Sequence, residues 1–172
     1  MRMKPKECKE SRVVRTSRVF PNDVNNHNTL FGGRLMSDVD QVASISAARH
    51  SRKECVTAST DSVDFLHPIR PSDSVCFESF VTWTGSSSME VFVKIVAEDL
   101  KSGDRKIAAT AFLTFVALDD NRRPAVVPGV IPVSDEEKKL HETAPMRAKK
   151  RQEHKAHSKE LAAFLTTGKA RP

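Results

Sequence analysis

The chain has 172 residues, of which 28 are Lys or Arg and 22 are Asp or Glu, so its formal net charge at pH 7 is +6. This length suits one globular domain with some additional chain. No apolar run approaches the roughly 20 residues of a membrane helix, and the opening MRMKPKECKESRVVR lacks the apolar stretch of a signal peptide. We therefore expect neither stable membrane insertion nor Sec export, and we predict a cytoplasmic protein.

Basic residues concentrate at the two ends of the chain. Residues 1–18 hold seven basic and two acidic residues, and residues 134–172 hold ten basic and six acidic ones, which leaves 11 basic and 14 acidic residues between them. A duplex-binding protein needs basic groups on a folded face. We therefore expect no nucleic-acid partner, and the basic ends can simply be solvated.

The cysteines and histidines do not form a metal-binding pattern. Cys8, Cys55 and Cys76 are widely spaced with no C-x-x-C pair, and the histidines of the body of the chain are scattered singly. The sequence predicts free thiols in a reducing compartment and no metal site.

The predicted elements begin with a polar segment, residues 1–10, that we expect to be disordered. VVRTSRVF (residues 13–20) has the β-branched content of a strand, and PNDVNNHNT (residues 21–29) has the composition of a loop. Residues 32–50 contain no proline and no glycine after Gly33, which predicts a helix.

Four strand-like segments follow: residues 55–66, 73–84, 88–100 and 105–118. The connections TGSSS and KSGD are short enough for antiparallel hairpins. Residues 121–172 are a proline-rich connector and a basic, charge-rich helical tail that we expect to pack weakly. A single helix covers only one face of such a sheet, so we predict an α+β homo-oligomer in which a partner covers the other face or edge.

The predicted helix carries one acid with a functional argument. At 100° per residue its apolar stripe comprises Leu35, Met36, Val39, Val42, Ala43 and Ala47. Asp40 lies at the edge of the stripe, whereas Asp38 points to the opposite side and is expected to be solvated. Desolvation against apolar groups raises the pKa of a carboxyl toward the range of a general base, so Asp40 is the candidate base. An interface salt bridge or a hydrogen bond to a hydroxyl on the sheet explains an acid there equally well.

Gly32 and Gly33 begin the same helix. The first N–H groups of a helix have no partner within it, and with the helix dipole they can stabilise negative charge developing on a carbonyl oxygen. The alternative is that both glycines serve only a tight turn or close packing.

Five sequence motifs follow one another along the chain. They are NNHNTLFGGRLMSDVDQVASISAARH (25–50), VTASTDSVDFLHPI (56–69), SDSV (72–75), SSSM (86–89) and AFLTFVALDD (111–120). In this combination the chain closely resembles the single-domain hotdog acyl-CoA thioester hydrolases of the brain-type acyl-CoA hydrolase family. The resemblance covers about residues 10–120, so we assign residues 11–120 to the domain. It implies a hotdog fold, in which a five- to six-stranded antiparallel sheet wraps a long central helix, two protomers form one continuous sheet, and dimers assemble into hexamers.

The resemblance implies hydrolysis of an acyl-CoA thioester to a fatty acid and CoA, without metal or cofactor. Asp40 matches the family's acid, as general base for water or as nucleophile, and the Gly33 amide polarises the thioester carbonyl. Asn25 matches the family's loop asparagine, and Thr29 has an orienting role. Asn28 stands where many members have Gly, and the turn survives if Asn28 adopts positive φ.

In such dimers the active site is shared between protomers, which adds candidates outside the helix. The candidate substrate-binding residues are Asn28, Thr60, Asp61, Ser62, Ser86, Ser87, Ser88 and Arg34. The hydroxyls and the acid of residues 60–62 can instead satisfy each other between subunits, and residues 85–88 can form an ordinary turn. The CoA phosphates require cations, for which Arg49, Arg52 and Lys53 are further candidates beside Arg34.

Two other functions remain open on the same fold. One is a non-catalytic module that senses acyl-CoA or a nucleotide. The other is dehydration of a hydroxyacyl thioester, which ranks third because such relatives carry an active histidine on the helix side and this helix has none before His50.

Overall fold

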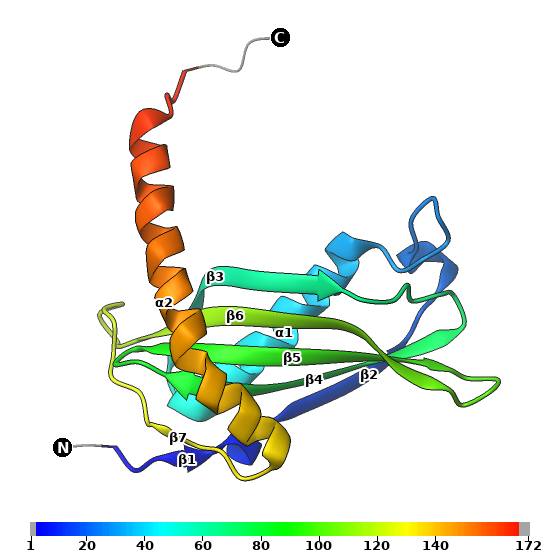
Figure 1. Cartoon of the computed structure of the whole chain (residues 1–172), viewed down its shortest axis with the longest axis horizontal. Coiled ribbons are helices and arrows are strands. Elements are labelled where there is room, and N and C mark those ends of the chain that lie inside the picture. Colours follow the sequence, from blue (N-terminus) through cyan, green and yellow to red (C-terminus); the bar gives the residue numbers. More distant parts are fainter. Residues whose placement is uncertain (1–2, 169–172) are drawn as a thin grey trace.

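The structure, a computed structural model, describes residues 3–168. A five-stranded antiparallel sheet in the order β2-β4-β5-β6-β3 wraps the long helix α1 (Figure 1). The main elements are β2 (Val13–Arg18), α1 (Gly32–Ser51), β3 (Glu54–Phe65), β4 (Asp73–Thr84), β5 (Ser88–Asp99), β6 (Arg105–Leu118) and α2 (Asp135–Phe164). The short elements are β1 (Lys6–Glu7), the 3-10 helices Cys8–Glu10 and Pro21–Asp23, and β7 (Val130–Ile131). The predicted α+β class, the helix and the five strands of the sheet are confirmed.

The main core lies between α1 and the concave face of the sheet. Alternate residues of the central strands point into it, as the period of two in their sequences predicts, and Phe77, Val91 and Ile95 are fully buried there. Ser79 has the same parity as Phe77, and its hydroxyl lies 2.7 Å from that of Ser46 on α1. Because that polar contact is satisfied inside the core, α1 has a defined position over the sheet.

The N-terminal segment is ordered where the structure describes it, so the prediction of disorder for residues 1–10 is wrong for residues 6–10. Lys6 and Glu7 pair in parallel with Val130 and Ile131 of β7. Cys8 is fully buried, and this burial raises the pKa of its thiol to about 12. The pairing partner lies over 120 residues away in the sequence, so local composition carried no sign of it.

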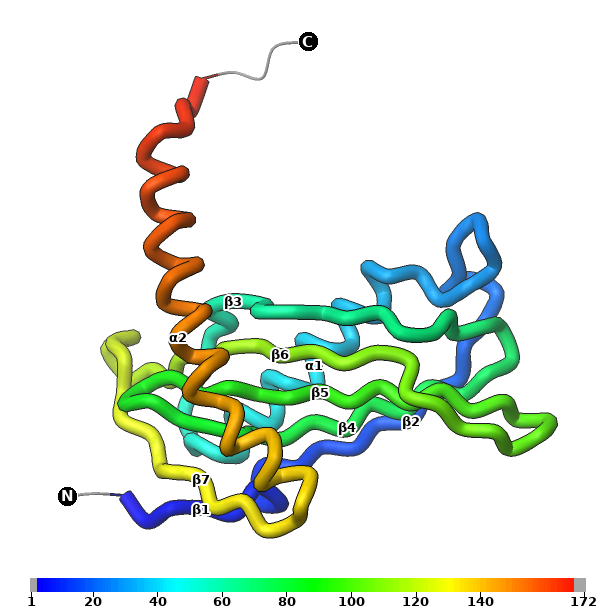
Figure 2. Tube along the Cα trace, in the orientation of Figure 1, coloured from blue at the N-terminus to red at the C-terminus, as the bar shows by residue number. Residues whose placement is uncertain are grey.

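The tail packs on the sheet more closely than its composition predicts. The first half of α2 crosses the convex face, opposite α1, and the second half extends away from the body (Figures 1 and 2). Ala144 and Glu137 are buried, and Leu140 packs against the cluster of Phe80, Phe92 and Phe112 on that face. The convex face, for which the sequence argument offered a partner as cover, therefore receives part of its cover from the same chain.

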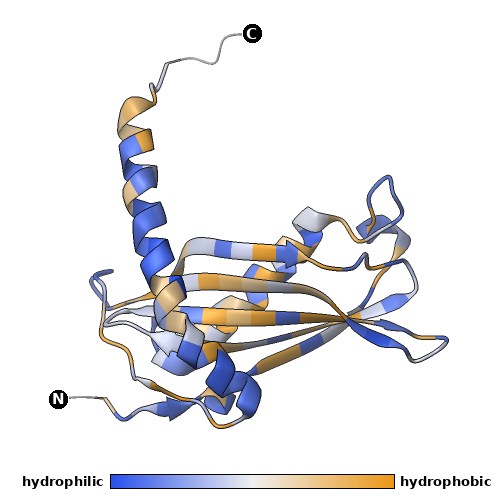
Figure 3. Ribbon diagram, viewed as in Figure 1, coloured by the Kyte–Doolittle hydropathy of each residue, from blue (hydrophilic) through white to orange (hydrophobic). Residues whose placement is uncertain are grey.

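The extended half of α2 is largely hydrophilic in Figure 3, and residues 152–164 are exposed. Across residues 3–168, the structure contains no helix that is both long and apolar enough to cross a membrane.

Candidate active site

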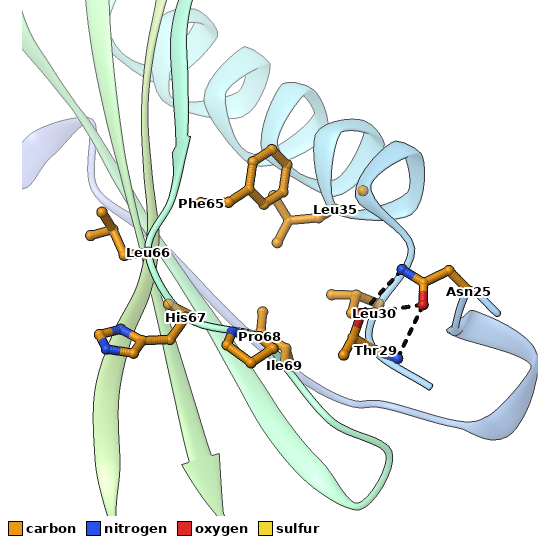
Figure 4. A pocket seen from close by; sticks show the side chains of 11 residues that line it. Asn25, Thr29, Leu30, Leu35, Phe65, Leu66, His67, Pro68 and Ile69 are labelled. Atoms are coloured by element: carbon orange, nitrogen blue, oxygen red, sulfur yellow. Dashed lines mark hydrogen bonds between the residues drawn. The ribbon is translucent and has the colours of Figure 1, made fainter. Parts of the chain in front are cut away.

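A pocket of about 390 Å³ opens beside the N-terminus of α1 (Figure 4). One wall is the loop that precedes α1, and the other is the chain that leaves β3. Its lining residues are Asn25, Thr29, Leu30, Gly32, Leu35, Phe65, Leu66, His67, Pro68, Ile69 and Ala108. Three predicted site residues, Asn25, Thr29 and Gly32, therefore line one cavity together with apolar side chains.

The Asn25 loop is held together by its own polar groups. The Asn25 Oδ1 atom accepts a hydrogen bond from the His27 amide at 2.9 Å, and the Thr29 hydroxyl lies 3.1 Å from Asn25 Nδ2. Asn28 adopts a φ of +58°, so the turn survives there as predicted, because Asn tolerates the left-handed region. Thr29 thus contacts Asn25 in the way an orienting residue would.

The N-terminus of α1 presents backbone donors without a side-chain cap. The residue before the helix is Phe31, which supplies no capping hydrogen bond. Within residues 3–168 the amides of Gly32 and Gly33 donate to no protein acceptor. A Cβ on Gly33 would lie 2.6 Å from the Phe31 ring, so glycine lets this ring and the helix start approach each other. Two free amides at the positive end of a helix are suited to bind a developing oxyanion.

Asp40 contacts the sheet through one hydrogen bond. The Thr57 hydroxyl on β3 donates to Asp40 Oδ1 at 2.9 Å. Asp40 is exposed in the single chain, so the burial on which the expected desolvation depends is not present there. The alternative of a hydrogen bond to a sheet hydroxyl is thus observed, and it leaves the second carboxylate oxygen of Asp40 open for a proton transfer.

Of the two aspartates Asp38 and Asp40, Asp38 is the buried one. The prediction that Asp38 is solvated is therefore wrong. Its side chain is 7% exposed and forms ion pairs with Arg15 at 2.5 Å and Arg34 at 3.4 Å. Arg15 reaches it from β2, the strand at the edge of the sheet, a neighbour that helical periodicity does not reveal. Arg34, a candidate for the CoA phosphates, keeps its side chain 56% exposed while it forms this pair.

Thr57 is not among the residues predicted from the sequence. Its place beside Asp40 follows from the lengths of the helix and of the strand that returns along it. The helix turns into β3 at Arg52, where φ is +56°. Asp40 lies 12 residues before this turn, or about 18 Å along the helix. Five residues of the returning strand span about the same distance, which places Thr57 beside Asp40.

Of the three neighbouring candidates on β3, only Thr60 shares the α1 face of the sheet. Thr60 pairs with Leu113, which belongs to the core under α1. Ser62 pairs with Phe112, whose ring faces α2, and Asp61 also turns toward α2. Within one chain, Thr60 therefore shares a face with α1, whereas Asp61 and Ser62 face α2.

The hairpin at residues 85–88 lies away from the pocket in this chain. Ser88 pairs with Val116, near the opposite end of β6 from Ala108, which lines the pocket. The carbonyls of Ser86 and Ser87 accept from Val127 and Ala117, so this turn anchors the connector after β6. The structure therefore shows the alternative, a structural turn, for Ser86, Ser87 and Ser88 within one chain.

His50 is fully buried at the end of α1, where its Nε2 donates to the Pro128 carbonyl at 2.9 Å. A histidine that is fully buried in this way has no exposed surface for a substrate. His50 therefore does not support the alternative in which the chain dehydrates a hydroxyacyl thioester. Among residues 3–168, no group of three or more His, Cys, Asp or Glu side chains is arranged to hold a metal ion.

Comparison with known proteins identifies the family. The model of the Thioesterase superfamily matches residues 27–103. The chain is 64% identical over 162 residues to the uncharacterized acyl-CoA thioester hydrolase YkhA of Bacillus subtilis, and the alignment covers 94% of each protein. The chain belongs to the thioesterase superfamily.

Solved structures place this superfamily member among acyl-CoA hydrolases. The acyl-CoA hydrolase of Bacillus cereus is 62% identical, with a TM-score of 0.92 over 95% of this chain and 99% of that one. The Staphylococcus aureus hydrolase, solved with butyryl coenzyme A, coenzyme A and coenzyme A disulfide, is 44% identical, with a TM-score of 0.90 over 93% and 98%. An apo-hexameric acyl-CoA thioesterase is 40% identical, with a TM-score of 0.87 over 90% and 99%. Other structures of the Staphylococcus aureus enzyme carry alanine in place of an aspartate, a threonine or an asparagine.

Proposed function

We propose that this chain hydrolyses acyl-CoA thioesters to a free fatty acid and CoA, with Asp40 as general base. The assignment of the base rests on one hydrogen bond. The Thr57 hydroxyl lies 2.9 Å from Asp40 Oδ1 and holds the carboxylate in place, while Asp40 Oδ2 stays available for the proton. Asp, Thr and Asn are also the residue types changed to alanine in the Staphylococcus aureus hydrolase. In this chain Asp40, Thr57 and Asn25 contribute the same three types.

The proposed reaction proceeds by attack of water on the thioester carbonyl carbon while Asp40 accepts a proton from that water. The amide of Gly33 stabilises the negative charge on the carbonyl oxygen, and Gly32 keeps the helix start accessible. The tetrahedral intermediate then collapses, the carbon–sulfur bond breaks, and Asp40 returns its proton to the leaving CoA thiolate. The reaction balances with water as the only co-reactant, so it calls for no cofactor.

We propose that the complete site forms between two protomers. Gly33 and Asp40 lie seven residues apart on the same helix, which separates them by about 10 Å along the axis. A base that acts through one water and an amide that binds the carbonyl oxygen both need to lie within about 3 Å of the reacting groups. Asp40 of one chain therefore acts with Gly33 and Asn25 of the partner.

The free edge of the sheet provides the surface for this dimer. β3 ends the strand order, so its outer backbone groups have no strand partner within residues 3–168. Exposed apolar side chains accompany that edge and the adjacent face of α1: Val56, Phe65, Leu66, Phe31, Met36 and Ile45. Pairing of two β3 strands would extend the sheet across both protomers, and assembly to a hexamer is supported by the hexameric relative.

The acyl chain of the substrate occupies the pocket beside Gly32 in this proposal. Leu30, Leu35, Phe65 and Ile69 give the pocket an apolar lining, while Asn25 marks its polar end.

The cysteines Cys8, Cys55 and Cys76 are free thiols, which supports a reducing, cytoplasmic location.

The deciding experiment measures thiol release from short-, medium- and long-chain acyl-CoA by the intact protein and by Asp40→Asn and Thr57→Val. We expect Asp40→Asn to reduce kcat by about two decades or more, the scale of a general base, and Thr57→Val to reduce it less. Asp38→Asn is the matched control: it removes a carboxylate two residues away that is ion-paired with Arg15 and Arg34, so we expect it to lower stability while kcat remains.

Failure of the intact protein to release thiol from any acyl-CoA refutes the proposed function. If acyl-CoA then raises the melting temperature and is recovered intact, the chain is a non-catalytic acyl-CoA sensor. Retention of activity by folded Asp40→Asn refutes the role of Asp40 alone.

A further inference from the structure

Two arginines of α2 meet a buried acid on the convex face of the sheet. Glu90 of β5 has no exposed side-chain surface, and its carboxylate accepts from Arg147 at 2.8 Å and from Arg151 at 2.6 Å. The Thr82 hydroxyl donates to the same carboxylate at 2.7 Å. Because a buried carboxylate needs such partners, the two arginines fix the position of α2 on the sheet.

Arg151 also reaches Asp61 of β3, whereas the described contacts of Arg147 do not include this acid. The Arg151 Nη1 atom lies 3.4 Å from Asp61 Oδ2, and both side chains are about 15% exposed or less. The hydroxyls of Thr114 and Ser59 donate to the same Asp61 carboxylate at 2.7 and 2.5 Å. Asp61 is therefore held from β3, β6 and α2 at once.

The strand segment that contains Asp61 is irregular on both sides of Ser59. Its register against β6 shifts between Thr57 and Ser59 and again between Thr60 and Ser62, so Ala58 and Asp61 are extra residues in β3. In a regular strand, residues 57 and 61 would point to the same face. Here Thr57 contacts Asp40 on the α1 side while Asp61 contacts Arg151 on the α2 side. Thr57 is the last regularly paired residue before the first shift, so it borders the irregular segment, and the two shifts turn Asp61 to the opposite face.

We propose that Arg151 is a positioning residue for the Asp40–Thr57 pair, acting through Asp61 and the irregular segment 57–62 of β3. This inference rests on the proposed function. The guanidinium of Arg151 compensates the Asp61 charge, and the fixed carboxylate holds Ser59 and the bulge in place. Thr57 lies at the start of that segment on the opposite face, so it is held at hydrogen-bonding distance from Asp40. The C-terminal helix is in this way a part of the catalytic architecture, although it does not touch the substrate.

The chain offers a matched pair of variants that separates positioning from docking of α2. Arg151→Met and Arg147→Met each remove one guanidinium from Glu90, but only the first removes the partner of Asp61. Asp61→Asn retains the size of the side chain and its acceptor oxygen while it removes the charge opposite Arg151. Arg151→Lys restores a positive charge near Asp61.

The experiment compares kcat, KM and melting temperature for these variants and for the double variant Arg151→Met/Asp61→Asn. Misplacement of a hydrogen-bonded base acts on the chemical step, so we expect Arg151→Met and Asp61→Asn each to lower kcat by about tenfold or more with little change in KM. The double variant should lose no more than either single variant, because the two residues act as a unit. Arg147→Met should lower the melting temperature and retain kcat within about twofold, and Arg151→Lys should recover part of the loss.

Hydrogen exchange measures the same link without reference to activity. We expect the amides of residues 57–62 to exchange faster in Arg151→Met and in Asp61→Asn than in the intact protein, and to remain protected in Arg147→Met. Asp61→Asn supplies both readouts if Arg151→Met does not fold.

Three outcomes overturn the proposal. One is an equal loss of kcat in Arg147→Met and Arg151→Met, which would show that only docking of α2 matters. Another is a double variant whose losses multiply, and the third is unchanged exchange of residues 57–62 in both Arg151→Met and Asp61→Asn. If the intact protein hydrolyses no acyl-CoA, the proposed function fails, and the exchange data still decide whether Arg151 orders this segment.

Discussion

Two aspartates on α1, two residues apart, have opposite surroundings. Asp38 is nearly fully buried between the guanidinium groups of Arg15 and Arg34, whereas Asp40 is exposed and bonded to one hydroxyl, that of Thr57. A buried carboxylate between two guanidinium groups serves to hold α1 against β2. A carboxylate with one oxygen free can exchange a proton with a bound ligand. The partners of each acid, more than its place on the helix, determine what it does.

At the same scale, His50 makes the stability of the fold depend on pH. Its Nε2 donates to the Pro128 carbonyl, and its Nδ1 is buried without a hydrogen-bond partner within residues 3–168. Burial, which removes the ring from water, lowers the pKa of His50, and the nearby charge of Lys6 acts in the same direction. In the unfolded chain the imidazole titrates near its ordinary pKa of about 6.5. The unfolded state therefore takes up the proton first, so this contribution to stability is complete above that pH and is lost as the pH falls below it.

We expect His50 to reduce the free energy of unfolding by up to about 1.4 kcal/mol at one pH unit below 6.5, relative to neutral pH. Urea unfolding at pH 7.5 and 5.5 measures this change. His50→Gln provides the comparison, since its amide can still donate to Pro128 but does not titrate in this range. An equal loss of stability in the intact protein and in His50→Gln would contradict the assignment to His50.

At the scale of the element, α2 is held by its caps and ion pairs and hardly by an apolar stripe. Ser134 precedes the helix and its hydroxyl accepts from the Glu137 amide at 3.2 Å, while the Glu137 carboxylate accepts from the Ser134 amide at 3.0 Å. Burial works to raise the pKa of Glu137, but hydrogen bonds from Val133, Ser134 and Arg12 outweigh it and hold that pKa below its ordinary value. The attachment of α2 is thus strongest above the ordinary glutamate pKa and weakens as acid protonates Glu137.

Loss of the cap should therefore destabilise the protein measurably. We expect Ser134→Ala to lower the free energy of unfolding by about 1 kcal/mol, the usual contribution of a serine cap. Chemical denaturation followed by circular dichroism measures it. Ser158→Ala is the matched control, because Ser158 lies in the exposed half of the same helix and should show no loss. Equal stability of Ser134→Ala and the intact protein would show that the ion pairs alone hold α2.

At the scale of the whole molecule, the two edges of the sheet differ in what lies beside them. The β3 edge adjoins exposed apolar residues of α1, whereas β2 at the other edge carries Arg15, which is paired with Asp38. The arginine on β2 is already engaged within the protomer, whereas the exposed apolar side chains beside β3 gain from burial against a partner. The dimer we propose therefore forms through β3.

We expect Val56→Lys, on β3, to convert the assembly to smaller species in light scattering coupled to size exclusion, and to abolish thiol release if the site is shared. Val56 is 47% exposed in the single chain, so the substitution leaves the fold of the protomer intact. Val14→Lys on β2, where Val14 is 61% exposed, is the control and should retain both mass and activity. A monomeric Val56→Lys variant that retains full activity would refute the shared site.

The order of the main elements, from β2 to β6, was determined by the sequence alone, because periodicity and turn composition are local properties. The alternation in residues 73–84 and 88–99 places Phe77 and Val91 in the core as predicted, and the absence of helix breakers in residues 34–50 predicts α1. The pocket residues Asn25, Thr29 and Gly32 lie close together in sequence, so their motif could be recognised from the sequence as well.

Only the tertiary structure decided the contacts between residues far apart in the chain. Thr57 meets Asp40 because a helix and its returning strand have equal lengths between the turn and these residues, and Asp61 faces α2 because two bulges reset the alternation of β3. The sequence predicted a solvated Asp38, but the structure buries it. This burial depends on Arg15, which lies on a strand at the far edge of the sheet. Burial and charge compensation depend on which surfaces meet in three dimensions, and that information is not present in any local window of the sequence.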